Sequence, residues 1–457
     1  MAGESQMRAR TETYEERLER VVLRPTTRTT RGWLALVLFL SAIVCWGLYA
    51  FIVQLRFGLI STGMRDQVFW GLYLVNFVFF IGISHAGTLI SAILRVTHAG
   101  WRTPITRMAE LITVVAISIG GLMPIIDMGR PDRVLNMFSF GRFQSPLLWD
   151  IISIMSYLSG SLIYFYLPSI PDFARMRDRL GQGSSVFKRR VLTTLAVGWK
   201  DTPEQRHRLE KAVSIMAVTI IPVAVSVHTV VSYVFSMTLR PGWDSTAFGI
   251  YFVIGAIFSG IASLLIVMAV FRKLYHFEEY ITDKHFKYLG YLLLTALLLY
   301  FYLTIGEYLT VGYKLAGEDK DLLALLFRGS NAQWFWTFVI AGMFVPAVLI
   351  IVRKGKVIPK LIVAAILVNI GMWLKRFVIV IPTLQVPLMP FEFGSYAPSW
   401  VEWSITLAAF AAFILIFTVA SRLIPLISIW EVAEEKQETK APEPQTAPTT
   451  LRVGRRA

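Results

Sequence analysis

The chain has 457 residues, enough for two or three soluble domains, but its composition excludes that organisation. Hydrophobic residues make up 55% of it and charged residues only 16%, and the mean hydropathy is +0.58. Apolar runs of about 20 residues or more recur along the chain, which is typical of a polytopic membrane protein. The single cysteine, Cys45, excludes an intrachain disulfide and a cysteine-held iron–sulfur cluster within this chain.

Residues 1–32 are polar, with seven arginines and five glutamates, and we interpret them as a cytoplasmic segment. No short apolar core with a cleavage site follows, so we expect no signal peptide. The stretch TYEERLERVV has charges at helical spacing, but a solvated tail is favoured over a surface helix. The other terminal segment, 426–457, is rich in Pro, Thr and Glu, and we expect a cytoplasmic tail that stays disordered until a partner binds it.

The region 33–425 between these segments is predicted to be one polytopic membrane domain in an all-α integral membrane protein. It holds about ten transmembrane helices, each long enough to cross the hydrocarbon core. The predicted spans are 33–53, 69–94, 108–127, 148–168, 213–238, 248–271, 288–313, 332–352, 361–382 and 400–421.

The basic residues predict the orientation of these spans. If the N-terminus is inside, the inner segments hold 34 of the 45 Lys and Arg residues and the outer loops hold 9. Such a bias places both termini in the cytoplasm. Topology and anionic lipid therefore explain the net charge of +15, and no nucleic-acid partner is needed.

Polar and ionisable residues concentrate between His85 and Asp150, in SHAGTLISAIL, WRTPITRMAELITVV, PIIDMGRPDRVLN and SPLLWD. Charges inside a bilayer are costly, so such residues are functional or paired. Oxidation of a quinol needs an apolar slot and groups that accept two protons. His85, Asp127, Asp150 and His228 lie on helices that short loops make neighbours, and they can supply that chemistry.

Each carboxylate also has a structural explanation. Asp150 follows Ser145 and Pro146, an N-cap and first-turn pair, so its charge can stabilise a helix N-terminus. Asp127 can form a salt bridge with Arg130 or Arg133. For each residue alone, the structural and the functional interpretation remain open.

A haem within the chain is not expected. His85 lies about 16 residues from the outer end of its span and His228 about 10, a depth difference of roughly 9 Å at 1.5 Å per residue. Two axial ligands need one level on opposite sides of the iron. We predict no haem, metal or iron–sulfur cluster in this chain.

Three further charged sites lie in or beside spans. Glu110 can begin a proton path or pair with Arg107. Lys375 and Arg376 are adjacent within a span, so at least one needs an anionic partner; an ion pair and a role in quinol binding or proton transfer both remain open. APSWVEW, with Pro398, Trp400 and Glu402, combines Pro, Trp and an acid within five residues as SPLLWD does, a weak similarity.

The motifs HAGTLISAIL, WRT-x-x-x-R-x-AE, MGRP and SPLLWD resemble the NrfD-like family of polysulfide-reductase membrane subunits. Further stretches resemble the ActC-type subunit of bacterial alternative complex III, and the resemblance covers about residues 30–425. These stretches are VSVHTVVS, PGW with YFVIGAIFSGIA, RKLYHFEEYIT, LVNIGMW-x-x-RFVIV and YAPSWVEW.

The resemblance implies two four-helix bundles plus flanking helices in the bacterial cytoplasmic membrane. It implies a cofactor-free subunit that oxidises quinol or menaquinol near the periplasmic side, in a respiratory or photosynthetic complex. Electrons then pass to an iron–sulfur, molybdopterin-like subunit and to multihaem cytochrome c subunits. A paralogous NrfD-like subunit and proton translocation are also implied.

Carried over by motif, Asp127 and Asp150 are the expected catalytic pair, and Arg130, His228 and Arg376 join His85 as candidate quinol-binding residues. Two departures stand out. Several relatives resemble a His-x-Gly-Arg-Pro pattern, in which His stands at the position of Asp127. Because this chain has a carboxylate there, repulsion between Asp127 and Asp150 is expected to keep one of the two protonated. Relatives can also carry an acid where this chain has Val234, which weakens a proton path along that helix.

Three other functions remain. The chain can be a structural anchor without a quinol site of its own, or a quinone-linked subunit of another molybdopterin-type reductase. A secondary transporter also has about ten spans with ionisable residues, but the matching pairs of Gly/Pro-interrupted helices typical of that class are not found.

Overall fold

The computed structural model describes residues 13–27, 30–179, 185–315, 317–352 and 355–440. Within these ranges the chain is helical without strands, and ten helical segments are long and apolar enough to cross a membrane. The predicted fold class, an all-α integral membrane protein, is confirmed, and each of the ten predicted spans overlaps one observed segment. The segments are α3 (Arg31–Phe57), α4 (Leu72–Val96), α5 (Thr103–Asp127), α7 (Pro146–Tyr166), α10 (Pro203–Ser236), α11 (Phe248–Leu274), α12 (Asp283–Lys314), α14 (Ala332–Val339) continued through the π-turn η4 (Ile340–Phe344) into α15 (Val345–Ile351), α16 (Val357–Gln385) and α17 (Trp400–Leu423).

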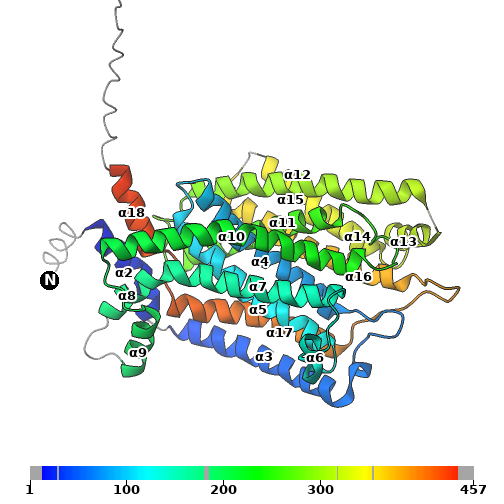
Figure 1. Cartoon of the computed structure of the whole chain (residues 1–457). Helices are drawn as coiled ribbons and strands as arrows, with labels where there is room; N and C mark the ends of the chain where they lie inside the picture. The colour runs from blue at the N-terminus through cyan, green and yellow to red at the C-terminus, as the bar shows by residue number, and fades with distance from the viewer. Residues whose placement is uncertain (1–12, 28–29, 180–184, 316, 353–354, 441–457) are drawn as a thin grey trace, which may run out of the picture.

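Shorter helices lie outside or at the ends of these spans. They are α2 (Tyr14–Thr27), η1 (Leu59–Ser61), η2 (Pro131–Arg133), α6 (Asn136–Ser139), η3 (Leu167–Ser169), α8 (Ile170–Asp178), α9 (Val186–Leu195), α13 (Gly317–Phe327) and α18 (Ile429–Lys440). Figure 1 shows α2, α8, α9 and α18 at one end of the helix bundle and α6 and α13 at the other. We call these the termini end and the far end.

The spans form two four-helix groups with flanking helices. In the first group, α4 packs on α5 and α10, and α7 packs on α5 and α10. In the second, α11, α12 and α14–α15 all pack on α16. Helix α4 also packs on α11 and α16 and so joins the two groups, while α3 lies against α17 on one side (Figure 1).

Helix α4 is the central element, and nearly all of its described side chains are buried. Gly87 lets α5 approach closely, because a Cβ there would lie 2.0 Å from the carbonyl oxygen of Ala109. At the same contact, Thr113 donates a hydrogen bond to the carbonyl oxygen of Ser84 at 2.7 Å. The polar side chains of α4 therefore face other helices rather than lipid.

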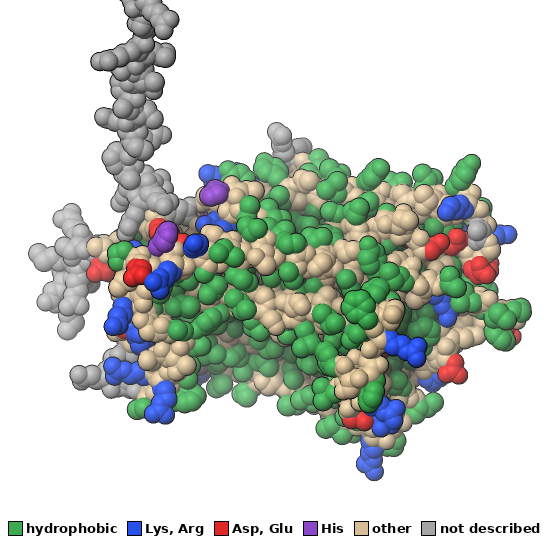
Figure 2. Space-filling view, in the orientation of Figure 1, with side chains coloured by type: hydrophobic (Ala, Val, Ile, Leu, Met, Phe, Trp, Pro, Cys, Tyr) green, Lys and Arg blue, Asp and Glu red, His purple; other side chains and the backbone are tan. Residues whose placement is uncertain are grey.

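The outer surface of the bundle is apolar between two polar ends. In Figure 2 hydrophobic side chains cover the middle of the visible face, and Lys, Arg, Asp and Glu gather at both ends. Phe39, Ile52, Tyr302 and Leu309 are among the exposed apolar side chains of α3 and α12. This distribution fits a multi-pass membrane protein, in which lipid covers the middle band.

Both terminal segments are more ordered than the sequence suggested. The solvated tail favoured for residues 1–32 is instead helical over Tyr14–Thr27, because Leu18 and Val22 are buried. Glu15 and Glu19 of this helix pair with Arg175 and Arg179.

The disorder expected from residue 426 is likewise wrong for its first part, since Ile429–Lys440 forms α18. Ile427 and Ile429 are buried there. Residues 1–12 and 441–457 lie outside the described residues, so the expectations for them stay predictions.

Candidate functional site

Asp150 lies on α7 near the far end and is 7% exposed. Ser145 occupies the N-cap position and Pro146 the first helical position, as expected, but the Ser145 side chain makes no capping hydrogen bond. Asp150 is the fifth residue of α7, just beyond the first turn, so helix-end stabilisation explains it poorly. Its Oδ1 atom is buried and has no hydrogen-bond partner in the described part of the chain.

Asp127 is the last residue of α5, and its buried Oδ1 likewise has no hydrogen-bond partner among the described residues. The salt bridge considered with Arg130 is not formed, because Arg130 pairs with Asp132 at 3.2 Å and both side chains are about 60% exposed. No ion pair joins Asp127 to Arg133 within the described ranges either. Arg130, a candidate quinol-binding residue, therefore points to solvent rather than toward the buried carboxylates.

The acidic neighbour of Asp127 is Glu402, which sequence reasoning treated only as part of a weak motif. Glu402 is fully buried in the first turn of α17, where it forms a capping box with Ser399. It accepts hydrogen bonds from the Gly63 amide at 2.6 Å and the Tyr396 hydroxyl at 2.5 Å. Burial, reinforced by the charge of Glu402, raises the pKa of the Tyr396 phenol.

The charge of Glu402 acts on Asp127, whereas no charged group in the described ranges acts comparably on Asp150. The expected repulsion between Asp127 and Asp150 is therefore not seen; the carboxylate pair is Asp127 with Glu402. A short chain of hydrogen bonds ends at the residue before Asp127, since Tyr73 donates to Gln54 at 2.6 Å and Gln54 donates to the Ile126 carbonyl oxygen at 2.8 Å.

His85 and His228 lie together in the middle of the bundle, with ring centroids 4.3 Å apart. The predicted depth difference of roughly 9 Å is wrong. It was counted along the two helix axes from the predicted span ends, whereas the two side chains reach toward each other across the helix contact. His85 instead contacts the carbonyl oxygen of Ala224, one turn before His228 on α10.

The two histidines differ in their hydrogen bonding. The ring nitrogens of His85 lie 2.7 Å from the carbonyl oxygens of Ile81 and Ala224. A neutral imidazole has one N–H, so only the protonated ring can donate to both carbonyls. Neither ring nitrogen of His228 has a partner among the described residues, although the side chain is fully buried. Both ring nitrogens of His85 face backbone carbonyl oxygens, so neither is directed at a second histidine across an iron, and the absence of a haem stays a prediction.

Arg376 lies beside His228, and its charge acts on that ring. Its side chain is 1% exposed, and none of its three guanidinium nitrogens has a hydrogen-bond partner in the described ranges. The guanidinium lies over the ring of Phe252, 5.1 Å from the centroid. Gly255 leaves room for it, because a Cβ there would be 3.2 Å from a guanidinium nitrogen.

Lys375 points to a different neighbourhood. Its Nζ donates to the Tyr308 hydroxyl at 2.8 Å and lies over the rings of Tyr251 and Phe338 at 5.1 and 5.4 Å. The acid near this pair of cations is Glu307 of α12, which lines the same small cavity as Lys375, but the two form no ion pair within the described ranges. Sequence reasoning missed Glu307, because it follows a long apolar run and gives no local motif.

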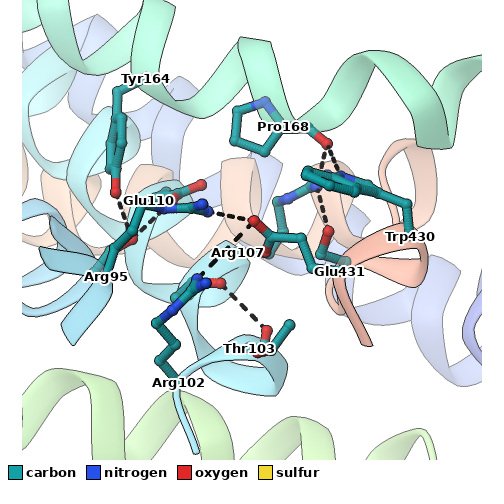
Figure 3. A network of polar contacts seen from close by, with 12 residues as sticks. Arg95, Arg102, Thr103, Arg107, Glu110, Tyr164, Pro168, Trp430 and Glu431 are labelled. Atoms are coloured by element: carbon teal, nitrogen blue, oxygen red, sulfur yellow. Dashed lines mark hydrogen bonds and ion pairs between the residues drawn. The ribbon is translucent and has the colours of Figure 1, made fainter. Parts of the chain in front are cut away.

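The termini end carries a dense, paired network (Figure 3). Arg107 does not pair with Glu110; it donates to Asp172 at 3.1 Å and to the Pro168 carbonyl oxygen at 2.9 Å. Glu110 is 3% exposed and accepts a hydrogen bond from Ser91 at 2.8 Å.

Helix α18 completes this network. Glu431 pairs with Arg95 and lies 4.0 Å from Arg102, and Trp430 donates to the Pro168 carbonyl oxygen at 2.8 Å. Burial alone would raise the pKa of Glu431, but Arg95 and Arg102 hold it below its usual value. Sequence reasoning missed Glu431, because it lies in a segment whose composition resembles a solvated tail.

These features define the class: a multi-pass membrane protein with buried ionisable side chains at both ends and in the middle of its helix bundle. Residues 60–388 match the family model described as polysulphide reductase, NrfD. The chain therefore belongs to the NrfD family, which confirms the resemblance seen in its motifs.

Three relatives extend this comparison. Over 424 residues the chain is 24% identical to a selenate reductase component of Mesobacillus selenatarsenatis, covering 88% of this chain and 97% of that protein. It is 25% identical to the Hdr-like menaquinol oxidoreductase integral membrane subunit of Archaeoglobus fulgidus, covering 88% and 96%. It is 32% identical to the membrane component of a putative dimethyl sulfoxide reductase of Halobacterium salinarum, but that match spans only 52% of this chain and about half, 51%, of the relative. All three are named as parts of reductases or oxidoreductases, and the last two are named as membrane parts.

Proposed function

We propose that the chain is the quinol-binding membrane subunit of a quinol:acceptor oxidoreductase and that it oxidises a quinol at the far end. The observation that carries this proposal is Asp150, a buried carboxylate with an unpartnered oxygen at the far end of the first helix group. A buried acceptor without a partner costs about 1–3 kcal/mol, and a quinol hydroxyl supplies the missing donor. The name of the Archaeoglobus relative, a menaquinol oxidoreductase subunit, favours menaquinol.

The reaction releases two protons and two electrons as the quinol becomes quinone. Asp150 accepts one hydroxyl proton directly. Asp127, whose buried Oδ1 also has no hydrogen-bond partner among the described residues, accepts the second proton. The electrons leave the chain for an iron–sulfur or molybdopterin-type subunit and then for haem c subunits, as in alternative complex III.

The far end offers such a partner a docking surface next to Asp150. In the far-end loop, residues 128–145 between α5 and α7, apolar side chains are exposed, from 52% at Phe138 to 81% at Phe140. Arg130 and Arg133 lie in the same loop and add positive charge. Exposed apolar patches with charged surroundings commonly mark protein interfaces. With the termini end in the cytoplasm of a bacterium, this docking surface faces the periplasm.

A series of buried polar groups supports proton translocation as part of the proposal. At the termini end, Ser91 contacts both Glu110 and the Tyr164 hydroxyl. Further along α4, the Ser84 carbonyl oxygen accepts a hydrogen bond at 3.0 Å from Tyr157 of α7, which also stacks on His85. Beyond His85 the buried polar groups fall into two clusters, His228 with Arg376 and, nearer the far end, Lys375 with Tyr308 and Glu307.

A second candidate function is a quinone-linked subunit of a molybdopterin-type reductase, with electrons flowing from quinol to a soluble reductase subunit. The names of the selenate reductase and dimethyl sulfoxide reductase relatives favour it. Both candidates use the same quinol site and differ in the partner. If the chain is instead a structural anchor, it only holds the electron-carrying subunits, and a paralogous subunit binds the quinol.

A membrane pull-down of the tagged full chain, with haem staining and iron analysis, distinguishes the candidates. Co-purifying c-type haem and iron–sulfur subunits support the alternative complex III assignment, and a molybdopterin subunit without haem c supports the second candidate. Photolabelling with an azidoquinone is expected to mark α5 or α7 of this chain. Labelling confined to another subunit would refute the quinol site.

A further inference from the structure

A groove lies between α12, α15 and α16 toward the termini end and has a volume of about 630 Å³. Its walls are mostly apolar, with Leu294 from α12, Leu349 from α15 and Leu361 from α16. Lys287 and Lys360 also line it. None of its described lining residues is acidic.

Helix lengths explain why the groove exists. The span formed by α14, η4 and α15 has 20 residues, Ala332–Ile351, whereas α12 has 32 and α16 has 29. The longer α12 therefore continues past the end of α15 and leaves one side of its first turns uncovered. The floor of the groove is a tight contact of α12 with α16, since a Cβ on Gly290 would lie 3.0 Å from Leu361.

The two lysines place positive charge at the mouth of this apolar groove. Lys360 Nζ donates to the carbonyl oxygen of Val352, the residue after α15, at 2.5 Å, which fixes its ammonium group at the end of that helix. Lys287 is exposed one turn into α12, and Tyr291, one turn further along the same face, is 65% exposed. Long basic side chains at helix ends reach toward lipid headgroups, and an exposed tyrosine suits that level.

We propose that this groove is a binding site for one anionic phospholipid. Its phosphate lies between Lys287 and Lys360, and an acyl chain fills the apolar groove along Leu294 and Leu349. The charge complementarity selects an anionic headgroup, and the position among membrane spans selects a lipid rather than a soluble anion or a protein. The site goes beyond the general attraction of basic loops for anionic lipid, because it binds a single molecule at a defined place.

Binding to the purified full-length chain tests this site. The chain is delipidated in detergent and titrated with phosphatidylglycerol or phosphatidylcholine, and native mass spectrometry counts the bound lipids. We expect one phosphatidylglycerol to bind more tightly than phosphatidylcholine. The Lys287→Gln variant is expected to weaken that binding about fivefold, the effect typical of one lysine near anionic lipid.

Two further variants sharpen the test. Lys284→Gln removes the same charge from the same helix end, but Lys284 lies over the Tyr288 ring outside the groove, so binding is expected to stay unchanged. Leu294→Trp fills the groove and is expected to abolish the tight site with both lysines intact. Equal binding of the two lipids, or equal effects of Lys287→Gln and Lys284→Gln, would overturn the proposal.

Discussion

The two ends of the helix bundle bury ionisable groups in opposite ways. At the termini end, Arg107 and Asp172 form a fully buried pair, and Glu431 is held by Arg95. At the far end, Asp127 and Asp150 form no ion pair among the described residues, although Asp172, like them, keeps one buried oxygen without a hydrogen-bond partner. A buried carboxylate beside a cation joins segments of the fold, whereas a buried carboxylate without a cation points to a functional role.

The middle of the bundle resembles the far end in this respect. Neither His228 nor Arg376 has a hydrogen-bond partner in the described part of the chain, and both are buried. We therefore expect substitutions at the termini end to change stability first, and substitutions at the far end to change activity first.

The largest effect is expected for Arg107→Gln. It leaves Asp172 buried without its cation and should lower the free energy of unfolding by about 3–5 kcal/mol. Thermal unfolding of the purified chain measures the loss. Arg206→Gln is the matched control, since its pair with Asp201 is nearly half exposed and should contribute at most about 0.5 kcal/mol. Equal effects of the two variants would contradict the structural role of the buried pair.

Asp150→Asn is expected to lower quinol oxidation at least tenfold, which corresponds to about 1.4 kcal/mol in the activation free energy. The amide keeps the shape but cannot accept the proton as a carboxylate does. Steady-state oxidation of a menaquinol analogue measures the loss, and co-purification of the partner subunits checks assembly.

Asp132→Asn is the control for Asp150→Asn, because Asp132 lies in the far-end loop but is 61% exposed. Its activity is expected to stay within about twofold of the native chain. Normal turnover of the Asp150 variant would remove this residue from the mechanism.

Glu431→Gln is expected to have the smallest effect, about 1 kcal/mol at neutral pH, because the glutamine amide oxygen still accepts the hydrogen bond from Arg95 and only the charge is lost. The lowered pKa of Glu431 means that its carboxylate stabilises the fold above the ordinary glutamate pKa of about 4.3. This stabilisation is lost as the pH falls through the lowered pKa of the folded state. The difference in melting temperature between native chain and variant should therefore shrink from pH 7 to pH 4.

The exposed pair of Glu204 and Arg208 supplies a control for the Glu431 experiment. Glu204→Gln should leave the melting temperature nearly unchanged at both pH values, since both side chains are at least 75% exposed. A difference for Glu431→Gln that stays constant over this pH range would show that its charge is not what stabilises α18.

Local sequence could not predict which buried side chains of the site contact each other. Asp127 and Asp150 were found as candidates because polar residues in apolar runs are rare. Their neighbours were not found, since Glu402 approaches Asp127 from a helix more than 270 residues away. In the same way, Arg107 had a near acid in Glu110 but pairs with Asp172.

The sequence by itself determined the ten spans, the all-α class and the family, because the hydrocarbon core imposes a length and an apolar composition that can be read locally. Only the tertiary structure decided which buried groups meet. It brought the rings of His85 and His228 into contact and docked α18 on the termini end. The physical reason is that helix tilt, relative depth and long-range packing set these contacts, and none of these leaves a periodic signal in the chain.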